Sequence, residues 1–277
     1  DRVVRLGRSA PRPVSPIIVV SGVGGAGKSA LAVHCAHLLA ADYPDGQLFA
    51  DLQGAGPTLD SADVLGRFLR ALGVSSADLP DSADERAELY RMTVANRRSI
   101  VVLDNVRGEH QVRQLLPGSG NCLVIITSRS RLTGIAGAEP VELDTLSVGA
   151  SIEMLSRIIG PDRVAADPEA AVTIARLCGG IPLAIRVAGA KLLARAHWPL
   201  RMLAHRLSDE RRRLDELAVG DLAIRSSLRV HYDELDEPQR RAFHLLTLLG
   251  LPDFGAWVAV PLLRSVQIGR ASCRERV

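Results

Sequence analysis

A run of glycines followed by lysine and serine lies near the start of the chain, in the sequence GVGGAGKS at positions 22–29. Glycines let a backbone turn so tightly that successive N–H groups converge on one point, where they can bind an anion. A lysine adds a compact positive charge, and a serine hydroxyl is a ligand that Mg²⁺ accepts. The spacing G-x-x-x-x-G-K-[ST] therefore predicts a phosphate-binding loop, lined by Gly22, Val23, Gly24, Gly25, Ala26, Gly27, Lys28, Ser29 and Ala30.

The composition of the chain further supports a phosphate-binding role for Lys28. The chain has 34 lysines and arginines together, and the only lysines are Lys28 and Lys191. The rigid fork of an arginine differs from an ammonium group in shape and reach, so arginine replaces this lysine poorly. The alternative is a glycine-rich turn that only joins a strand to a helix, and such a turn would not require lysine.

A second candidate element is the sequence IVVLDN at positions 100–105. Asp104 ends a buried strand, where a carboxylate can hold the water shell of Mg²⁺. By itself, Asp104 could equally cap a following helix. Asn105 stands where many ATPases carry a second acid, and an amide cannot accept a proton. We therefore expect slow hydrolysis, and we expect Asn105→Asp or Asn105→Glu to speed it if the Mg²⁺ geometry survives the extra charge.

A third element follows the apolar run LVIIT, where Ser128 and Arg129 end another strand. An arginine at this position can reach a γ-phosphate, although an ordinary surface arginine remains an alternative. His34 and His37 lie three residues apart and are interpreted as facing solvent rather than holding a metal. Cys178 is interpreted as a buried residue at a helix end rather than a nucleophile.

The two tryptophans, Trp198 and Trp257, are interpreted as core or interface anchors. Four cysteines without a CxxC spacing predict neither a zinc site nor a disulfide framework. The net charge of +3 gives little support for nucleic-acid binding, and the cluster at 211–213 is interpreted as a solvated helix face. No run of about 18 apolar residues is present, so we expect a cytoplasmic protein without a membrane partner.

Stretches with strand-like patterns at 15–22, 46–54, 99–105, 121–129 and 139–144 predict five strands, and those at 15–22, 99–105 and 121–129 contain apolar runs. Helical patterns at 29–41, 60–72 and 82–97 alternate with them, and Ser82 with Glu85 fits a capping box. This alternation predicts an α/β fold with a mostly parallel sheet and helices on both faces. Helical patterns continue at 148–159, 168–178, 182–196 and 199–207. Two further helices are expected within 221–263, the second opened by Asp236 and Pro238.

The order of these motifs resembles the NB-ARC module of the STAND class of P-loop NTPases. It is most similar to antibiotic-regulatory-type transcriptional regulators of actinobacteria. The likeness covers about residues 17–263 and rests on GGAGKSALAVHCAH, DYPDGQLFADLQG, VVLDN, VIITSRSRL, CGGIPLAIRVAGAKL and GDLAIRSSLRVHYDELDEPQRRAFHLLTLL. The resemblance implies ADP or ATP with Mg²⁺ as cofactors, with Ser29 and Asp104 on the metal. It further implies that Arg129 senses the γ-phosphate and that Pro182 packs on the adenine.

The resemblance also implies a division of the chain. Residues 1–16 would be a truncated linker, 17–147 the P-loop domain, 148–218 a helical subdomain, and 219–266 the start of a winged helix that closes over ADP. Residues 267–277 would be an artefact, since IGRASCRERV is encoded by a string that resembles a sequencing adapter. We therefore interpret the chain as a fragment.

The function implied is a nucleotide-operated switch in a signalling or transcription protein. ADP would hold it closed and ATP would open it, with self-association on activation and with DNA bound only through a domain outside this chain. Two alternatives remain open. One is a turnover ATPase of the AAA-like type, and the other is a DNA-binding protein that acts through its winged helix.

Overall fold

The computed structural model describes residues 2–8, 15–52, 60–118, 120–219, 222–223, 225, 229, 232 and 235–247. The chain divides into two compact units, residues 1–222 and 223–277. The predicted artefact, Trp257 and most of the predicted winged helix lie outside the described residues. Among the helices that are described, none has the length and apolar character needed to cross a membrane.

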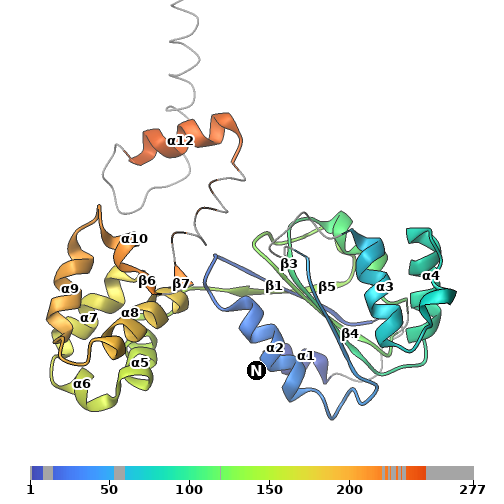
Figure 1. The fold of residues 1–277 in the computed structure, drawn as a ribbon, viewed down its shortest axis with the longest axis horizontal. Helices are drawn as coiled ribbons and strands as arrows, with labels where there is room; N and C mark the ends of the chain where they lie inside the picture. Colours follow the sequence, from blue (N-terminus) through green and yellow to red (C-terminus); the bar gives the residue numbers. More distant parts are fainter. Residues whose placement is uncertain are drawn as a thin grey trace, which may run out of the picture. The chain divides into compact units, whose positions relative to one another are not determined.

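Within the described residues, the first unit contains a five-stranded sheet in the order β2-β3-β4-β1-β5. Strands β1, β3, β4 and β5 of this sheet are labelled in Figure 1. Its strands are β1 (Ile17–Gly22), β2 (Gln47–Asp51), β3 (Ile100–Val106), β4 (Leu123–Ser128) and β5 (Ala138–Leu143). All of the neighbouring strands pair in parallel, so their carboxyl ends share one edge of the sheet. The predicted parallel α/β sheet is confirmed.

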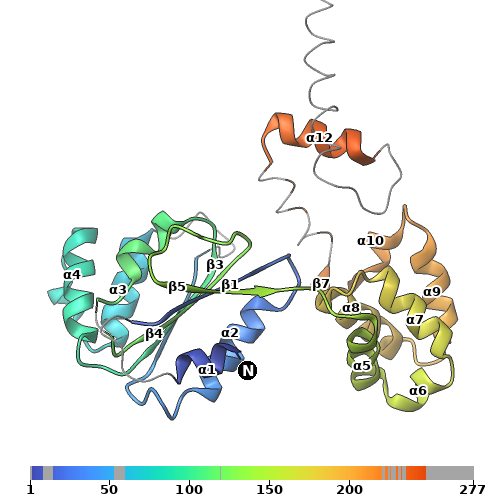
Figure 2. The same cartoon turned by 180° about the vertical axis from the view of Figure 1, so that it is seen from behind.

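Helices cover both faces of the sheet, because successive side chains of a strand point to opposite faces. Ile18 and Val20 pack in one core with α1 (Arg2–Gly7) and α2 (Lys28–Leu38). Val19 packs in the other core with α3 (Ser61–Ala71) and α4 (Ala83–Val94). Figures 1 and 2 show these two helix layers from opposite sides. A strand buried on both faces requires the uninterrupted apolar runs seen in the sequence.

The caps of α3 and α4 differ. Asp60 caps α3, since its side chain accepts a hydrogen bond from the Ala62 N–H. Ser82 occupies the N-cap position of α4 without a side-chain hydrogen bond, so the predicted capping box with Glu85 is wrong. Both of these side chains are exposed, and water can satisfy the first N–H groups of the helix. Arg86, in the first turn of α4, connects α4 to the start of α3, because its guanidinium donates a hydrogen bond to the carbonyl oxygen of Ala62 at 2.9 Å.

Residues 148–216 form a series of helices joined by short connections. The helices are α5 (Val148–Ile159), α6 (Pro161–Ala165), α7 (Pro168–Leu177), α8 (Pro182–Ala194), α9 (Leu200–Ser208) and α10 (Arg213–Glu216). The sequence patterns predicted four of them and missed α6 and α10, which are too short for a clear period. Gly189 of α8 lets α5 approach closely, because a Cβ there would lie 2.6 Å from Cγ2 of Ile158. Two short strands, β6 (Ala218–Val219) and β7 (Leu222–Ala223), pair after α10.

The second lysine of the chain holds α8 to α10 through a buried ion pair. Lys191 and Glu216 are each 8% exposed. The Lys191 ammonium donates to the Glu216 carboxylate at 2.5 Å and to its backbone carbonyl at 2.8 Å. Arg206 of α9 donates to the other carboxylate oxygen at 2.6 and 2.9 Å. The Arg206 hydrogen bonds, followed by the Lys191 contact, lower the pKa of the Glu216 carboxyl to about 2.

The second unit is described mainly at α12 (Glu237–Thr247). Asp236 and Gln239 form a reciprocal cap at its start. The Gln239 N–H donates to the Asp236 carboxylate at 2.8 Å, and the Asp236 N–H donates to the Gln239 side-chain oxygen at 3.0 Å. The predicted opening of this helix at Asp236 is confirmed.

Candidate functional site

The glycine-rich loop connects the end of β1 to the start of α2, as its sequence predicts. Gly22 ends β1 with φ 151°, and a Cβ at this position would lie 2.4 Å from the carbonyl oxygen of Leu143. Gly27 precedes α2 in the left-handed region, with φ 93°. The loop therefore depends on glycine both for its turn and for its close approach to β5. The first N–H groups of α2 point out of the helix here, which favours an anion.

Lys28 folds back over this loop. Its ammonium donates to the carbonyl oxygens of Gly22 and Val23, each at 2.9 Å, and the residue is 8% exposed. An ammonium group has three N–H donors, so two of them fix its position and the third is left for a ligand. Burial, and then the positive charge of Arg129, lower the pKa of Lys28, while Asp104 raises it. An anion placed at this loop would therefore relieve an unfavourable concentration of positive charge.

Arg129 follows β4 and is half-buried. Its Nη1 atom is buried and makes no hydrogen bond within the described part of the chain. An unpaired buried guanidinium nitrogen is costly, which indicates that a negatively charged ligand completes this position. Strand β4 lies between β1 and β3, so Arg129 stands between the glycine-rich loop and Asp104.

Asp104 lies near the end of β3 and is 5% exposed. Its two carboxylate oxygens have different partners. The hydroxyl of Thr127, on β4, donates to one of them, and the side-chain amide of Asn105 donates to the other at 3.2 Å. Thr127 also accepts a hydrogen bond from the Asn105 backbone N–H at 3.0 Å. These contacts fix the orientation of the Asp104 carboxylate at the edge of the sheet.

The structure adds a residue that the sequence reasoning missed. Asp51 ends β2, and its carboxylate accepts a hydrogen bond from the Asn105 side-chain amide at 3.0 Å. Asn105 has φ 57°, a left-handed conformation that asparagine tolerates better than most residues. A register shift between Leu103 and Val106 produces this turn of the chain. The sequence signal that could have identified Asp51 was an acid at the end of the strand QLFAD, since that strand ends at the same edge of the sheet as the strand that carries Asp104.

Pro182 lies at the start of α8, beside the glycine-rich loop. The N–H of Leu183, the next residue, donates to the carbonyl oxygen of Gly25 at 3.1 Å. The preceding Gly180 has φ 65°, and its carbonyl accepts from the N–H of Leu146 at 2.7 Å. The sequence-predicted residues Lys28, Asp104, Arg129 and Pro182 thus border one edge of the sheet.

The remaining candidates lie elsewhere in ordinary roles. His34 and His37 are exposed on α2. Cys178 is 3% exposed at the end of α7, and burial raises the pKa of its thiol to about 12, so it is a packed residue and a poor nucleophile. Trp198 is half-buried, and the guanidinium groups of Arg195 and Arg206 lie 4.7 and 5.3 Å from its ring centre.

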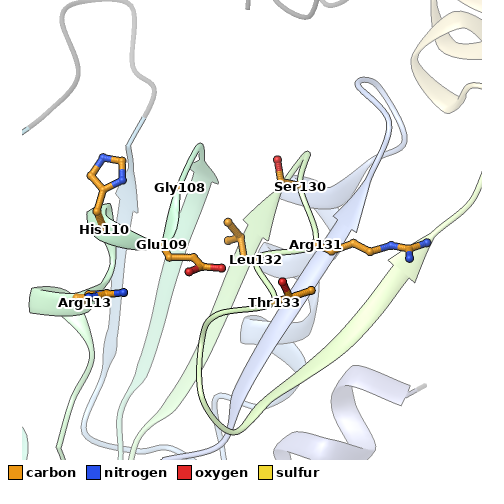
Figure 3. A pocket seen from close by; sticks show the side chains of 8 residues that line it. All are labelled: Gly108, Glu109, His110, Arg113, Ser130, Arg131, Leu132 and Thr133. Carbon is orange, nitrogen blue, oxygen red and sulfur yellow. The ribbon is translucent and has the colours of Figure 1, made fainter. Parts of the chain in front are cut away.

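An open cavity of about 560 Å³ lies between the loops that follow β3 and β4 (Figure 3). It is lined by Gly108, Glu109, His110, Arg113, Ser130, Arg131, Leu132 and Thr133. Two of its charged side chains are already engaged. Arg131 pairs with Glu142 at 2.9 Å, and Glu109 accepts a hydrogen bond from the Gly134 N–H. None of the sequence-predicted site residues lines it.

The donor set fits Mg²⁺. Ser29 is half-buried in the first turn of α2, and Asp104 is a buried carboxylate at the same edge, so both offer hard oxygen ligands. Within the described residues, no group of three or more His, Cys, Asp or Glu side chains is placed to hold a metal ion. A cation here would therefore need phosphate oxygens and water as further ligands, which is how Mg²⁺ usually binds.

Comparison with known proteins identifies the family of the chain. The family model of the NB-ARC domain matches residues 7–165. The chain belongs to the NB-ARC family. Two "Regulatory protein AfsR" sequences, from Streptomyces griseus and from Streptomyces coelicolor, are each 45% identical to it, over 256 and 258 residues. These alignments cover 92% and 93% of the chain but 26% of each relative, so this NB-ARC chain spans about a quarter of their length.

Among solved structures, CDC6P from Pyrobaculum aerophilum has a similar fold. The TM-score is 0.55 at 14% sequence identity, and the match covers 94% of this chain and 76% of that one. At this identity the likeness concerns the fold alone. It agrees with the P-loop NTPase architecture of the NB-ARC sheet.

Proposed function

We propose that this NB-ARC chain is an adenine-nucleotide switch of a regulatory protein, with residues 22–30 as the phosphate site. The observation that carries the proposal is the charge arrangement at the loop. The positive charge of the Arg129 guanidinium acts on the Lys28 ammonium, and the negative charge of Asp104 opposes it. A nucleotide phosphate would supply the missing negative charge, with Lys28 on the β- and γ-phosphates and Arg129 on the γ-phosphate.

Mg²⁺ would be held by Ser29 and Asp104. When bound, the ion neutralises charge on the phosphates. The chain's own contribution is to keep the Asp104 carboxylate fixed, which the Thr127 hydroxyl and the Asn105 amide do. Pro182 would pack on the adenine, since the hydrogen bond from Leu183 to Gly25 brings the start of α8 to the loop.

The hydrogen bond from Leu183 to Gly25 could couple nucleotide binding to a conformational change. A nucleotide shifts an equilibrium only through contacts that differ between two states. A γ-phosphate that draws Arg129 and Lys28 toward it would change the conformation of the loop at Gly25. It would thereby change the position of the start of α8, which is hydrogen-bonded to Gly25. In this proposal, residues 17–147 bind the nucleotide and residues 148–218 respond, ADP favouring a closed state and ATP an open one.

Hydrolysis is proposed to be slow, because Asn105 is an amide and its donor group is already bonded to two carboxylates. In the same proposal the protein is cytoplasmic and self-associates when it opens, and DNA is bound through a domain outside this chain. The 45% identity to regulatory proteins supports the regulatory part of this proposal.

Calorimetric titration of the chain with ADP and Mg²⁺ tests the proposal. We expect tight binding that Lys28→Ala abolishes with little change in melting temperature. Arg131→Ala is the matched control, because it removes an exposed cation near the same edge and should leave affinity unchanged. Equal ADP affinity in Lys28→Ala and the unmodified chain would refute the phosphate site. Hydrolysis of many ATP per second without a partner would favour a turnover ATPase instead.

A further inference from the structure

The environment of Asn105 shows a second acid at the proposed nucleotide site. Asp51 and Asp104 are register partners on the adjacent strands β2 and β3, so their Cα atoms stand side by side. The backbone continues this pairing, because the N–H of the buried Leu52 donates to the carbonyl oxygen of Asp104 at 3.0 Å. The position of Asp51 is therefore fixed by the pairing of β2 with β3.

The side-chain amide of Asn105 bridges the two acids. Its nitrogen donates to Asp51 at 3.0 Å and to Asp104 at 3.2 Å, and so uses both amide hydrogens on carboxylates. The bridge requires the left-handed φ of 57° at Asn105, which costs free energy relative to an ordinary strand residue. Two carboxylates at a partly buried edge repel each other, and a donor shared between them reduces that repulsion. A strained asparagine that holds two acids together indicates a purpose beyond stability.

We propose that Asp51 is the carboxylate that orients the attacking water in ATP hydrolysis, and that Asn105 is the positioning residue that holds Asp51 beside Asp104. This inference rests on the proposed nucleotide site. The sequence alone suggested that the chain lacks a second acid because residue 105 is an amide. The structure supplies an acid from the neighbouring strand instead.

The chemistry requires no further reactant. A water molecule donates a hydrogen bond to the Asp51 carboxylate while its oxygen bonds to the γ-phosphorus. The bond from the γ-phosphorus to the bridging oxygen breaks, and ADP leaves with the electron pair of that bond. The proton released by the water passes to the inorganic phosphate and to solvent. Asp51 acts as a hydrogen-bond acceptor, which positions the water.

The strand order also accounts for a slow reaction. Strands β4 and β3 separate β1 from β2, so Asp51 lies one strand farther than Asp104 from the glycine-rich loop. Neighbouring strands are about 4.8 Å apart. A water molecule held by Asp51 is thus farther from the glycine-rich loop than one held at the end of β3.

Single-turnover hydrolysis of Mg-ATP, with the chain in excess, tests the proposal. Asp51→Asn should slow hydrolysis about 100-fold, as expected when a reacting group loses its orientation. Its affinity for ADP should stay within about threefold of the unmodified chain, because a water-orienting group contributes to the rate and not to binding. Asp45→Asn is the matched control. It makes the same acid-to-amide change before the opposite end of β2, where Asp45 accepts from the Arg98 N–H at 2.7 Å.

Two further measurements separate orientation of water from a structural role. Formate should restore part of the hydrolysis in Asp51→Gly, since it supplies a carboxylate, while acetamide should not. The side-chain NH₂ signals of Asn105 in a ¹⁵N-labelled sample should shift in Asp51→Asn and stay unchanged in Asp45→Asn.

Each outcome decides between the proposals. Hydrolysis at the unmodified rate in Asp51→Asn, with ADP still bound, would overturn this inference alone. If Asp51→Asn lowers both the affinity for ADP and the melting temperature, the inference is overturned in favour of a structural role. An unmodified chain that binds ATP but hydrolyses none over a day would overturn it as well. Failure of the unmodified chain to bind ADP would refute the proposed function itself.

Discussion

Replacement of Asn105 by aspartate is the sharpest test of how the carboxyl edge of the sheet is built. From the sequence, Asn105→Asp was expected to add a missing acid and to speed hydrolysis. The contacts of Asn105 reverse this expectation. Its amide donates to Asp51 and to Asp104, and an aspartate would replace that donor with a third negative charge. We expect a less stable protein and slower hydrolysis.

The cost follows from two contributions. A hydrogen bond to a charged group contributes about 1.5–3 kcal/mol, and Asn105→Asp removes two of them. Two unit charges 4 Å apart repel by about 4 kcal/mol at an effective dielectric constant of 20. Asp51 and Asn105 are only half-buried, so solvent screens part of this repulsion, and protonation of one carboxyl limits it further. We expect the free energy of unfolding to fall by about 3 kcal/mol at pH 7 without metal.

Urea denaturation with and without millimolar Mg²⁺ measures this effect. Mg²⁺ should recover part of the loss, because a cation offsets the added carboxylate. Asn121→Asp is the control, since Asn121 is an exposed amide that donates to the Ala95 carbonyl at 3.0 Å. There we expect a change below about 0.5 kcal/mol. An Asn105→Asp variant as stable as the unmodified chain in EDTA, and faster in single turnover, would refute the reasoning.

Three other perturbations test separate parts of the structure. Lys28→Arg should lower ADP affinity about 100-fold in calorimetry with little change in melting temperature, whereas Lys191→Arg should lower the melting temperature and leave affinity intact. The Glu216 carboxyl has its pKa lowered from 4.5 to about 2, so its contribution to stability is full above the unfolded value and is lost as the pH falls toward 2. Glu216→Gln should therefore be less stable at pH 7 by about 2 kcal/mol, and the difference in melting temperature should disappear by about pH 2. Gly25→Ala should weaken ADP binding more than Gly73→Ala: both glycines have positive φ, but only a Cβ at Gly25 would meet Ile181, at 3.0 Å.

The sequence predicted those parts of the molecule whose signal is contiguous. Strands β1, β3 and β4 contain uninterrupted apolar runs because helices cover both faces of the sheet, and all five of its strands were found within a few residues of their observed bounds. The helices α5, α7, α8 and α9 were found because each is a contiguous stretch with a helical pattern of residues. The capping box at Ser82 was wrong because a residue pattern does not decide between a side chain and water as the partner of an exposed N–H.

The site was only partly predictable. The loop at 22–29 carries its chemistry in one stretch of sequence, and Asp104 ends a strand that was identified correctly. The link between Asp51 and Asn105 joins residues 54 positions apart and depends on the register of β2 with β3 and on the irregularity after Leu103. Neither the pairing register nor the left-handed turn at Asn105 leaves a signal in the local pattern of residues.

The two lysines illustrate how far composition can lead. Both are 8% exposed, so both occupy sites that select a compact ammonium group over a guanidinium. Lys28 places its charge between the carbonyls of Gly22 and Val23, and Lys191 places its charge against Glu216. The scarcity of lysine therefore identifies buried ammonium sites, and only one of these borders a glycine-rich turn. Lys191 already has a carboxylate partner, whereas Lys28 lies beside a second cation, Arg129. It is this second positive charge, and not the rarity of the residue, that points to a phosphate at Lys28.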